Sequence, residues 1–217
     1  MPIVGYILAA LAGYLLGSIP TGYLVAAARG LDIRTVGSGN IGATNVFRYL
    51  GVPAGIFVLL SDAFKGWLAV VVVTRILSSW LQMPGGLQER EWMTIIAGLS
   101  AILGHNYTCW LHFKGGKGIA TSAGVLLALV PWAFLMILGI WIIIFALTRY
   151  VSLASICAAA ALPFSAWLTR QSSTIVLIMA LMGALAIYKH KANIQRLLRG
   201  TENRIGKSKT PRGTGAP

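Results

Sequence analysis

The sequence predicts an all-α integral membrane protein with about seven transmembrane helices, some of them short or partly re-entrant. Hydrophobic residues make up 57% of the 217-residue chain and charged residues only 11%, whereas soluble domains carry about 25% charged residues. Long apolar stretches recur along the chain, and short basic segments separate them. These stretches are long enough to form helices that cross a bilayer.

The apolar stretches define the expected helices in order. The first has no charge, no basic n-region and no A-x-A cleavage site, so we expect a retained span and not a signal peptide. Pro131 lies near the middle of one long apolar run, which therefore forms either one kinked span or two short ones. The stretches are Ile3–Ala28, Val52–Leu81, Met93–His112, Ile119–Leu147 (two helices if the chain breaks at Pro131), Val151–Leu168 and Thr174–Tyr188.

The distribution of charge predicts the orientation. Eighteen Lys and Arg outnumber five Asp and Glu, and the basic residues gather in the loops after alternate segments and after Tyr188. The positive-inside rule makes these loops and the C-terminus cytoplasmic, which requires an external N-terminus. All of the basic loops and the C-terminus lie on the cytoplasmic side only if Ile119–Leu147 crosses the membrane twice. A five-span arrangement with shallow segments is also physically possible.

The domain organisation follows from the same pattern. Residues 1–200 are predicted to form a single helical transmembrane domain, and residues 201–217 a basic, disordered cytoplasmic tail near anionic headgroups. Because the basic residues flank apolar segments, we expect them to set topology and contact anionic membrane lipid, and we expect no nucleic acid partner.

A polar loop, Gly37–Arg48, follows the first apolar stretch. Its glycines allow close backbone approach to a ligand, its Ser, Thr and Asn residues supply neutral donors, and Arg48 supplies a forked cation. The loop contains no carboxylate, whereas Mg²⁺ and Ca²⁺ sites use several hard oxygen ligands of that kind. The composition therefore favours a phosphate site over a metal site.

Two further polar segments are predicted on the same side of the membrane. In Phe113–Thr121, two glycines bracketed by lysines precede a helix, and helix N-termini bind anions. Its spacing does not match a nucleotide P-loop. In Lys189–Arg196, His190, Asn193 and Arg196 share one face if the segment is helical. Glycines that merely end helices and lysines that reach headgroups explain each segment alone, but the three together favour a functional site.

Four segments together resemble the motifs of bacterial acyl-phosphate:glycerol-3-phosphate acyltransferases, and the resemblance extends over nearly the whole chain. They are Gly17–Thr21, Gly37–Arg48, Phe113–Thr121, and Lys189–Arg196 with Gly200 and Glu202. The resemblance implies an integral enzyme of the bacterial plasma membrane. We expect its active site at the cytoplasmic face, a monomeric state, and no metal or cofactor. Such an enzyme moves a fatty acyl group from acyl phosphate to the 1-hydroxyl of glycerol 3-phosphate, which yields lysophosphatidic acid and inorganic phosphate.

The resemblance also assigns roles to individual residues. It places Ser38, Gly115, Gly116 and Lys117 around the acyl phosphate, with backbone N–H groups contributing. It implies that Thr44, Asn45 and Arg48 bind glycerol 3-phosphate or bridge the two phosphates. His190 and Asn193 would complete the glycerol 3-phosphate site, and Lys65 is a further candidate for phosphate charge. Since Asp62 and Lys65 are one turn apart in an apolar segment, where an unpaired charge costs about 3 kcal/mol or more, they should pair or face the site.

The mechanism and a rival function remain open at the level of sequence. Thioester-using acyltransferases employ a His with an Asp five positions on, and none of the three histidines here has one. We therefore hypothesise catalysis by positioning and charge stabilisation, in which a substrate phosphate takes the proton. A covalent acyl-Ser38 intermediate is the rival. A membrane transporter of phosphate or glycerophosphate, or a lipid-binding scaffold, would also use basic and glycine-rich segments, but no internal repeat is visible.

Overall fold

The computed structural model describes residues 2–81 and 86–206. These residues form helices and loops and contain no strand, which confirms the all-α prediction. The last part of the predicted tail, residues 207–217, lies outside the described residues. The first part, residues 201–206, is irregular and ends in a turn at 205–206, and Ile205 N donates to Arg149 O at 3.0 Å. Within the described ranges the chain is therefore tied down beyond residue 200.

The helices follow one another with short connections. In chain order they are α1 (Pro2–Ser18), α2 (Thr21–Ala27), α3 (Ala43–Leu50), α4 (Val52–Leu68), the π-helical turn η1 (Ala69–Val73), α5 (Thr74–Trp80), α6 (Leu87–Asn106), the 3-10 turn η2 (Cys109–Leu111), α7 (Ile119–Leu129), α8 (Pro131–Thr148), α9 (Val151–Leu168), α10 (Ser173–Lys189) and α11 (Lys191–Leu198). Each apolar stretch is largely helical, and the chain breaks at Pro131 as expected. The first stretch is also interrupted at Ile19 and Pro20, and the helix of the third ends at Asn106 and not at His112.

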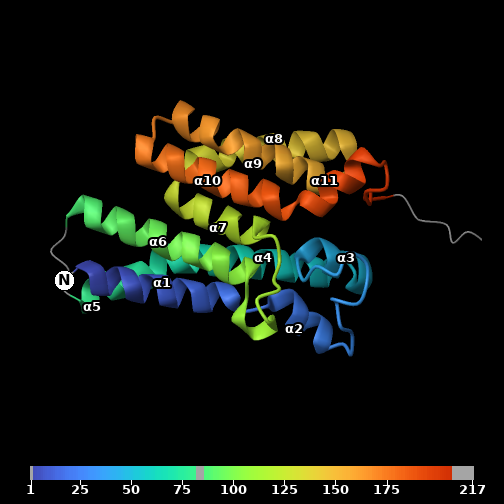
Figure 1. The fold of residues 1–217 in the computed structure, drawn as a ribbon, viewed down its shortest axis with the longest axis horizontal. Coiled ribbons are helices and arrows are strands. Elements are labelled where there is room, and N and C mark those ends of the chain that lie inside the picture. The colour runs from blue at the N-terminus through green and yellow to red at the C-terminus, as the bar shows by residue number, and fades with distance from the viewer. Residues whose placement is uncertain (1, 82–85, 207–217) are drawn as a thin grey trace, which may run out of the picture.

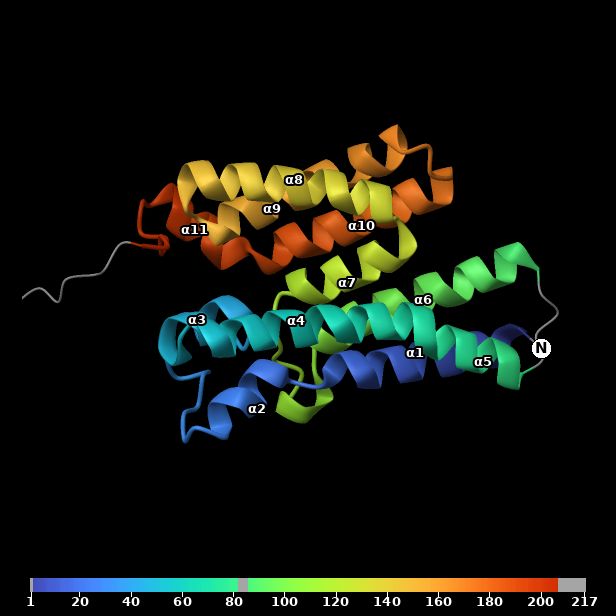
Figure 2. The same cartoon turned by 180° about the vertical axis from the view of Figure 1, so that it is seen from behind.

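The helices form a two-part bundle (Figures 1 and 2). One part contains α1 to α6, and the other contains α8 to α11. Helix α7 lies between them and packs on α4, and the other large helix pairs are α1 with α6, α8 with α9 and α9 with α10. The core at the junction contains Val125 of α7, Leu162 of α9 and Met179 of α10. The chain thus forms one continuous packed unit.

Glycines bring the helix backbones close together. A Cβ atom at Gly17 of α1 would overlap the carbonyl of Ala101 in α6, and one at Gly124 of α7 would overlap the carbonyl of Ala63 in α4. Small residues at such crossings are the usual means of packing helices in lipid, where the hydrophobic effect between helices is absent.

Several helices are suited to a bilayer. Four helical stretches are long and apolar enough to cross it, namely Ile3–Ala27, Val52–Trp80, Pro131–Thr148 and Val151–Leu168. The pair α10 and α11, bent by 59°, gives a fifth if it is one broken span. Large apolar side chains cover the outside of these helices, among them Phe57, Ile143 and Leu147. The membrane class is confirmed, while the count of seven spans stays a prediction.

Candidate active site

The loop before α3 is held by Asn45. This buried side chain donates from Nδ2 to the carbonyls of Ile33 at 3.2 Å and Val36 at 3.1 Å, and its Oδ1 accepts from the N–H of Ser38 at 3.2 Å. All three bonds fix the loop to the first turns of α3. Asn45 therefore shapes the loop that presents Ser38.

Ser38 lies between two glycines with left-handed backbones. Gly37 has φ +61° and Gly39 has φ +67°, a region that favours glycine. A Cβ atom at Gly37 would also overlap Oδ1 of Asn45. The exposed Ser38 hydroxyl is consequently carried on a tight turn whose shape depends on its neighbours.

The second motif folds back on the end of α6. The N–H of Gly115 donates to Asn106 O at 3.3 Å and that of Gly116 to His105 O at 2.9 Å. Side chains at either position would overlap α6, since a Cβ at Gly115 would meet the His105 carbonyl and a Cβ at Gly116 would meet its imidazole Nε2. These glycines therefore let the loop pack closely on the end of α6, and their N–H groups are bonded to carbonyls of α6. The side chain of Lys117 extends from this loop toward α11.

The third motif is helical and is anchored by an acidic residue. Helix α11 places Asn193 and Arg196 one turn apart. Oε1 of Glu202 accepts from Asn193 Nδ2 at 2.8 Å and from the Ser152 hydroxyl at 2.9 Å, and its Oε2 accepts from Arg196 Nε at 2.7 Å. Burial raises the pKa of Glu202, but these hydrogen bonds outweigh it and lower the pKa overall. Glu202 is therefore a charged clamp between α9 and α11.

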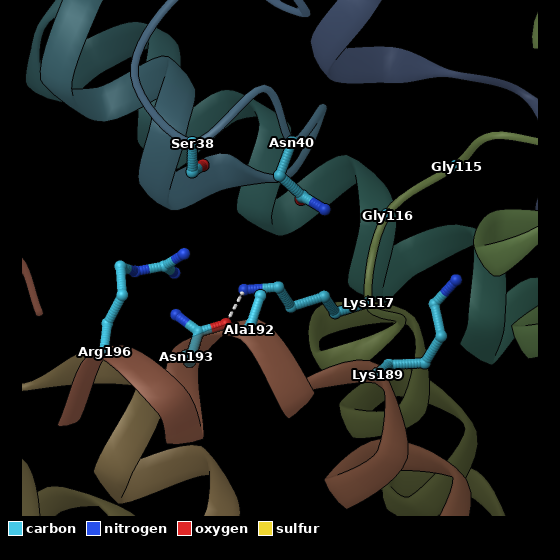
Figure 3. A pocket seen from close by; sticks show the side chains of 9 residues that line it. All are labelled: Ser38, Asn40, Gly115, Gly116, Lys117, Lys189, Ala192, Asn193 and Arg196. Carbon is cyan, nitrogen blue, oxygen red and sulfur yellow. Dashed lines mark hydrogen bonds between the residues drawn. The ribbon is translucent and has the colours of Figure 1, made fainter. Parts of the chain in front are cut away.

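The three motifs meet around one pocket of about 210 Å³ (Figure 3). Lys117 Nζ donates to Oδ1 of Asn193 across it, and the two side chains point toward each other in the figure. The lining residues are Ser38, Asn40, Gly115, Gly116, Lys117, Lys189, Ala192, Asn193 and Arg196. Segments 158 residues apart in the chain, at Ser38 and Arg196, thus form one site.

The pocket is electropositive. Lys117, Lys189 and Arg196 line it, and no carboxylate is among its lining residues. Burial lowers the pKa of Lys117 to about 8; Glu202 opposes this shift, whereas the positive charges of Arg196, Arg48 and Lys189 add to it. A cluster of cations that depress one another's protonation is stabilised by an anionic ligand, and phosphate suits Lys and Arg donors.

The remaining predicted residues lie around this pocket or behind it. Thr44 and the exposed Arg48 are on α3. The buried His190 stands at the bend between α10 and α11, with Nδ1 2.8 Å from Ala186 O. None of the three is among the lining residues.

Lys65 lies in a buried ion pair away from the pocket lining. Its Nζ is 2.8 Å from Asp62 Oδ1 and donates to Ile19 O at 2.8 Å. The His105 Nδ1 lies 3.6 Å from the same Asp62 oxygen. The His105 ring in turn packs against Gly116. The ion pair of Asp62 and Lys65 therefore supports, through His105, the loop that carries Lys117.

Three polar lining residues were not among those assigned to the site from the sequence: Asn40, Lys189 and Arg196. Arg196 follows Asn193 at a spacing that puts both on one helix face, so its position was detectable. No sequence pattern distinguishes Asn40 from the other polar residues of its loop. Its Oδ1 accepts a hydrogen bond from the Gly42 N–H at 2.9 Å. Only the fold shows that it faces the same pocket as Lys189.

The chain is similar to known proteins over nearly its whole length. Residues 7–200 match the family model described as glycerol-3-phosphate acyltransferase. A relative of that name from Geotalea daltonii is 48% identical over 190 residues, covering 88% of this chain and 92% of its own. One from Thermosynechococcus vestitus is 46% identical over 203 residues, covering 93% and 95%.

Solved structures agree with the fold. The chain is similar to the crystal structure of PlsY (YgiH), an integral membrane glycerol 3-phosphate acyltransferase, in its glycerol 3-phosphate form. The TM-score is 0.81 at 38% identity, over 93% of this chain and 96% of that one. The lysophosphatidic acid form gives a TM-score of 0.79 at 37% identity, over 93% and 95%.

Fold and site together define an integral membrane protein with an electropositive pocket built from glycine-rich loops and a bent helix. The family match and the relatives at this level of identity make the assignment specific. The chain belongs to the glycerol-3-phosphate acyltransferase family, and the resemblance read from its motifs is confirmed.

Proposed function

We propose that this membrane acyltransferase moves a fatty acyl group from acyl phosphate to the 1-hydroxyl of sn-glycerol 3-phosphate, yielding lysophosphatidic acid and phosphate in the first step of phospholipid biosynthesis. The observation that supports the chemistry most directly is the pocket lined by Lys117, Lys189 and Arg196. Both substrates carry phosphate, and such a cluster of cations favours phosphate groups.

The geometry suggests how the two substrates divide the pocket. The acyl phosphate lies against Ser38 and Lys117, with Gly115 and Gly116 shaping the wall; because their N–H groups bind α6, the lysine supplies the main attraction. Glycerol 3-phosphate lies toward Asn193, and the residues near that side but outside the pocket lining, Thr44, Arg48 and His190, support its binding from around the pocket. Asn45 acts through the loop it holds, and Lys65 through the support it gives below the pocket.

The reaction requires no protein nucleophile. The 1-hydroxyl oxygen bonds to the acyl carbonyl carbon, the bond from that carbon to the phosphate oxygen breaks, and phosphate leaves with the electron pair. No carboxylate or histidine lines the pocket in the described residues, and Glu202 is occupied by three donors. A phosphate oxygen of a substrate therefore takes the proton, while the cations stabilise the developing charge.

The pocket is expected at the cytoplasmic side of the membrane. Seven crossings with an external N-terminus put all three motifs at the cytoplasmic face of the bacterial plasma membrane, because the basic loops flank them. The water-soluble acceptor then enters from the cytoplasm, and the acyl chain of the donor extends sideways between helices into lipid. We expect the pocket to function in a monomer, since all of its lining residues come from one chain.

Vesicles containing the purified protein test this function against transport. With palmitoyl phosphate and labelled glycerol 3-phosphate, the enzyme makes labelled lysophosphatidic acid and accumulates no free label inside. Uptake of label without new lipid would support a transporter instead. In acid-quenched samples lacking acceptor, the mechanism predicts no acyl-enzyme; a trapped acyl group that disappears in Ser38→Ala would establish the covalent route.

A further inference from the structure

A second pocket lies at the opposite end of the bundle from the acyltransferase site. It is larger, about 560 Å³, and lies between η1, α5, α6 and α7. Its wall includes Arg75, Ser79 and Arg90, and its apolar part includes Val70, Val71 and Ala128. Figure 1 shows α5 and the start of α6 at one end of the molecule and α3 and α11 at the other. The two pockets therefore share no lining residue and are separate.

The two arginines of this pocket are available for a ligand. The ion pairs of the described residues involve Arg34, Lys65 and Arg196, and not Arg75 or Arg90. Within the same ranges neither guanidinium makes a side-chain hydrogen bond. Glu89 and Glu91 are close in sequence to Arg90 and still form no ion pair with it. Two exposed guanidinium groups at one pocket present forked donors suited to a phosphate.

The surroundings place this end of the bundle at a membrane interface. Four tryptophans lie at or near helix ends there: Trp80 is the last residue of α5, Trp92 lies in the second turn of α6, Trp132 is the second residue of α8, and Trp167 is the last but one of α9. All are exposed, by 72%, 39%, 70% and 67% respectively. Exposed tryptophans gathered at one level are typical of the headgroup region of a bilayer. This pattern favours a position for the two guanidinium groups near the level of lipid phosphates.

The apolar wall fits a lipid better than a free anion. Val70 and Val71 belong to the π-helical turn inside the long apolar stretch Val52–Trp80. Such turns interrupt regular helix and are frequent at functional sites. A pocket with cations at the interface and valines deeper in the membrane matches an amphiphile in both charge and depth.

We propose that this pocket binds an acidic phospholipid, with the headgroup phosphate between Arg75 and Arg90 and the start of an acyl chain against Val70 and Val71. Ser79 supplies a further hydroxyl donor. The bound lipid joins α5 to α6 and is separate from the substrates of the acyltransferase site.

Native mass spectrometry of the detergent-solubilised full chain tests the proposal. Wild type, an Arg75→Gln/Arg90→Gln double variant and Arg170→Gln are titrated with phosphatidylglycerol or phosphatidylcholine. Arg170 is the matched control, because it is an exposed arginine in the turn between α9 and α10 at the same end of the bundle. We expect the double variant to lose one tightly held phosphatidylglycerol, with affinity at least about tenfold weaker, and the control to match wild type.

Each other outcome contradicts the proposal. Equal phosphatidylglycerol retention in the double variant would remove Arg75 and Arg90 from any lipid site. Equal loss of phosphatidylcholine would mean a change without headgroup specificity, and displacement of the lipid by millimolar inorganic phosphate would mean a free-anion site.

Acyl transfer in phosphatidylcholine vesicles, measured on the same variants, should be unchanged. Since both arginines are exposed, single Arg75→Gln and Arg90→Gln variants provide the same comparison if the double variant folds poorly.

Discussion

The ammonium of Lys117 donates a hydrogen bond to Oδ1 of Asn193, which joins the loop before α7 to α11 across the pocket. Asn193 in turn donates to Glu202. Lys117, the cation of the glycine-rich loop that lines the pocket, is therefore oriented by Asn193, which is itself held by Glu202. An incoming phosphate can replace the amide as the partner of Lys117, which gives a stronger charge-assisted bond.

Replacement of Lys117 should affect the use of substrate much more than the fold. We expect Lys117→Ala to lower kcat/KM for palmitoyl phosphate by about 10²- to 10³-fold, the usual loss when a charge-stabilising donor is removed. Lys114→Ala is the control, since Lys114 is an exposed residue of the same loop and does not line the pocket. Steady-state kinetics of both variants check this. An equal loss of activity in Lys114→Ala and Lys117→Ala would contradict the assignment of Lys117 to the acyl phosphate.

The pKa of Lys117 predicts a pH dependence. Burial holds it at about 8 in the free enzyme, so the ammonium is present below that pH and is lost as the pH rises through it. Because kcat/KM reports groups of the free enzyme, it should fall above pH 8, approaching about tenfold per pH unit. Lys117→Arg keeps its charge and should flatten the profile between pH 8 and 9.5. An identical decline in this variant would assign the titration to another group.

Loss of the Glu202 charge should loosen α11. Glu202→Gln removes the ion pair with Arg196 and weakens the bonds from Asn193 and Ser152. We expect a loss of about 1–3 kcal/mol in the free energy of unfolding together with reduced transfer. Glu91→Gln, at an exposed carboxylate of α6, should behave as wild type. Thermal unfolding in detergent measures both, and an unchanged midpoint for Glu202→Gln would mean that the clamp contributes no stability.

A methyl group at Gly116 should displace the loop of Lys117. The added Cβ would overlap the imidazole of His105, which is buried beside Asp62. We expect Gly116→Ala to reduce kcat/KM by about 10²-fold through misplacement of the lysine. Gly139→Ala is a matched control, because a Cβ there meets nothing within 4 Å. Kinetics alike for the two variants would show that the close approach of Gly116 to His105 is unimportant.

Much of the fold could be predicted from local features of the sequence. The apolar stretches gave helices at the expected places, and Pro131 separates α7 from α8 because proline starts a helix well but interrupts one. The 59° bend between α10 and α11 has no such signal. It occurs at His190, with no glycine or proline beside it, and contacts from distant segments accompany it, such as Lys189 Nζ to Asn106 O at 3.1 Å.

The site was predictable in composition and less so in detail. Ser38, Lys117 and Asn193 meet as the motifs suggested. The roles of Asn45 and Gly116 depend on what each contacts, which spacing along the chain does not show. Lys65 illustrates the same limit: charges one turn apart predicted either a pair or a ligand group, and the structure shows the pair with Asp62.

The most direct test of the account is the choice of acyl donor. Purified protein in lipid is supplied with labelled glycerol 3-phosphate and either palmitoyl phosphate or a palmitoyl thioester, beside Lys117→Ala. We expect lysophosphatidic acid from palmitoyl phosphate alone and a severe loss of this product in the variant. Transfer from the thioester alone, or full activity from palmitoyl phosphate without Lys117, would contradict it.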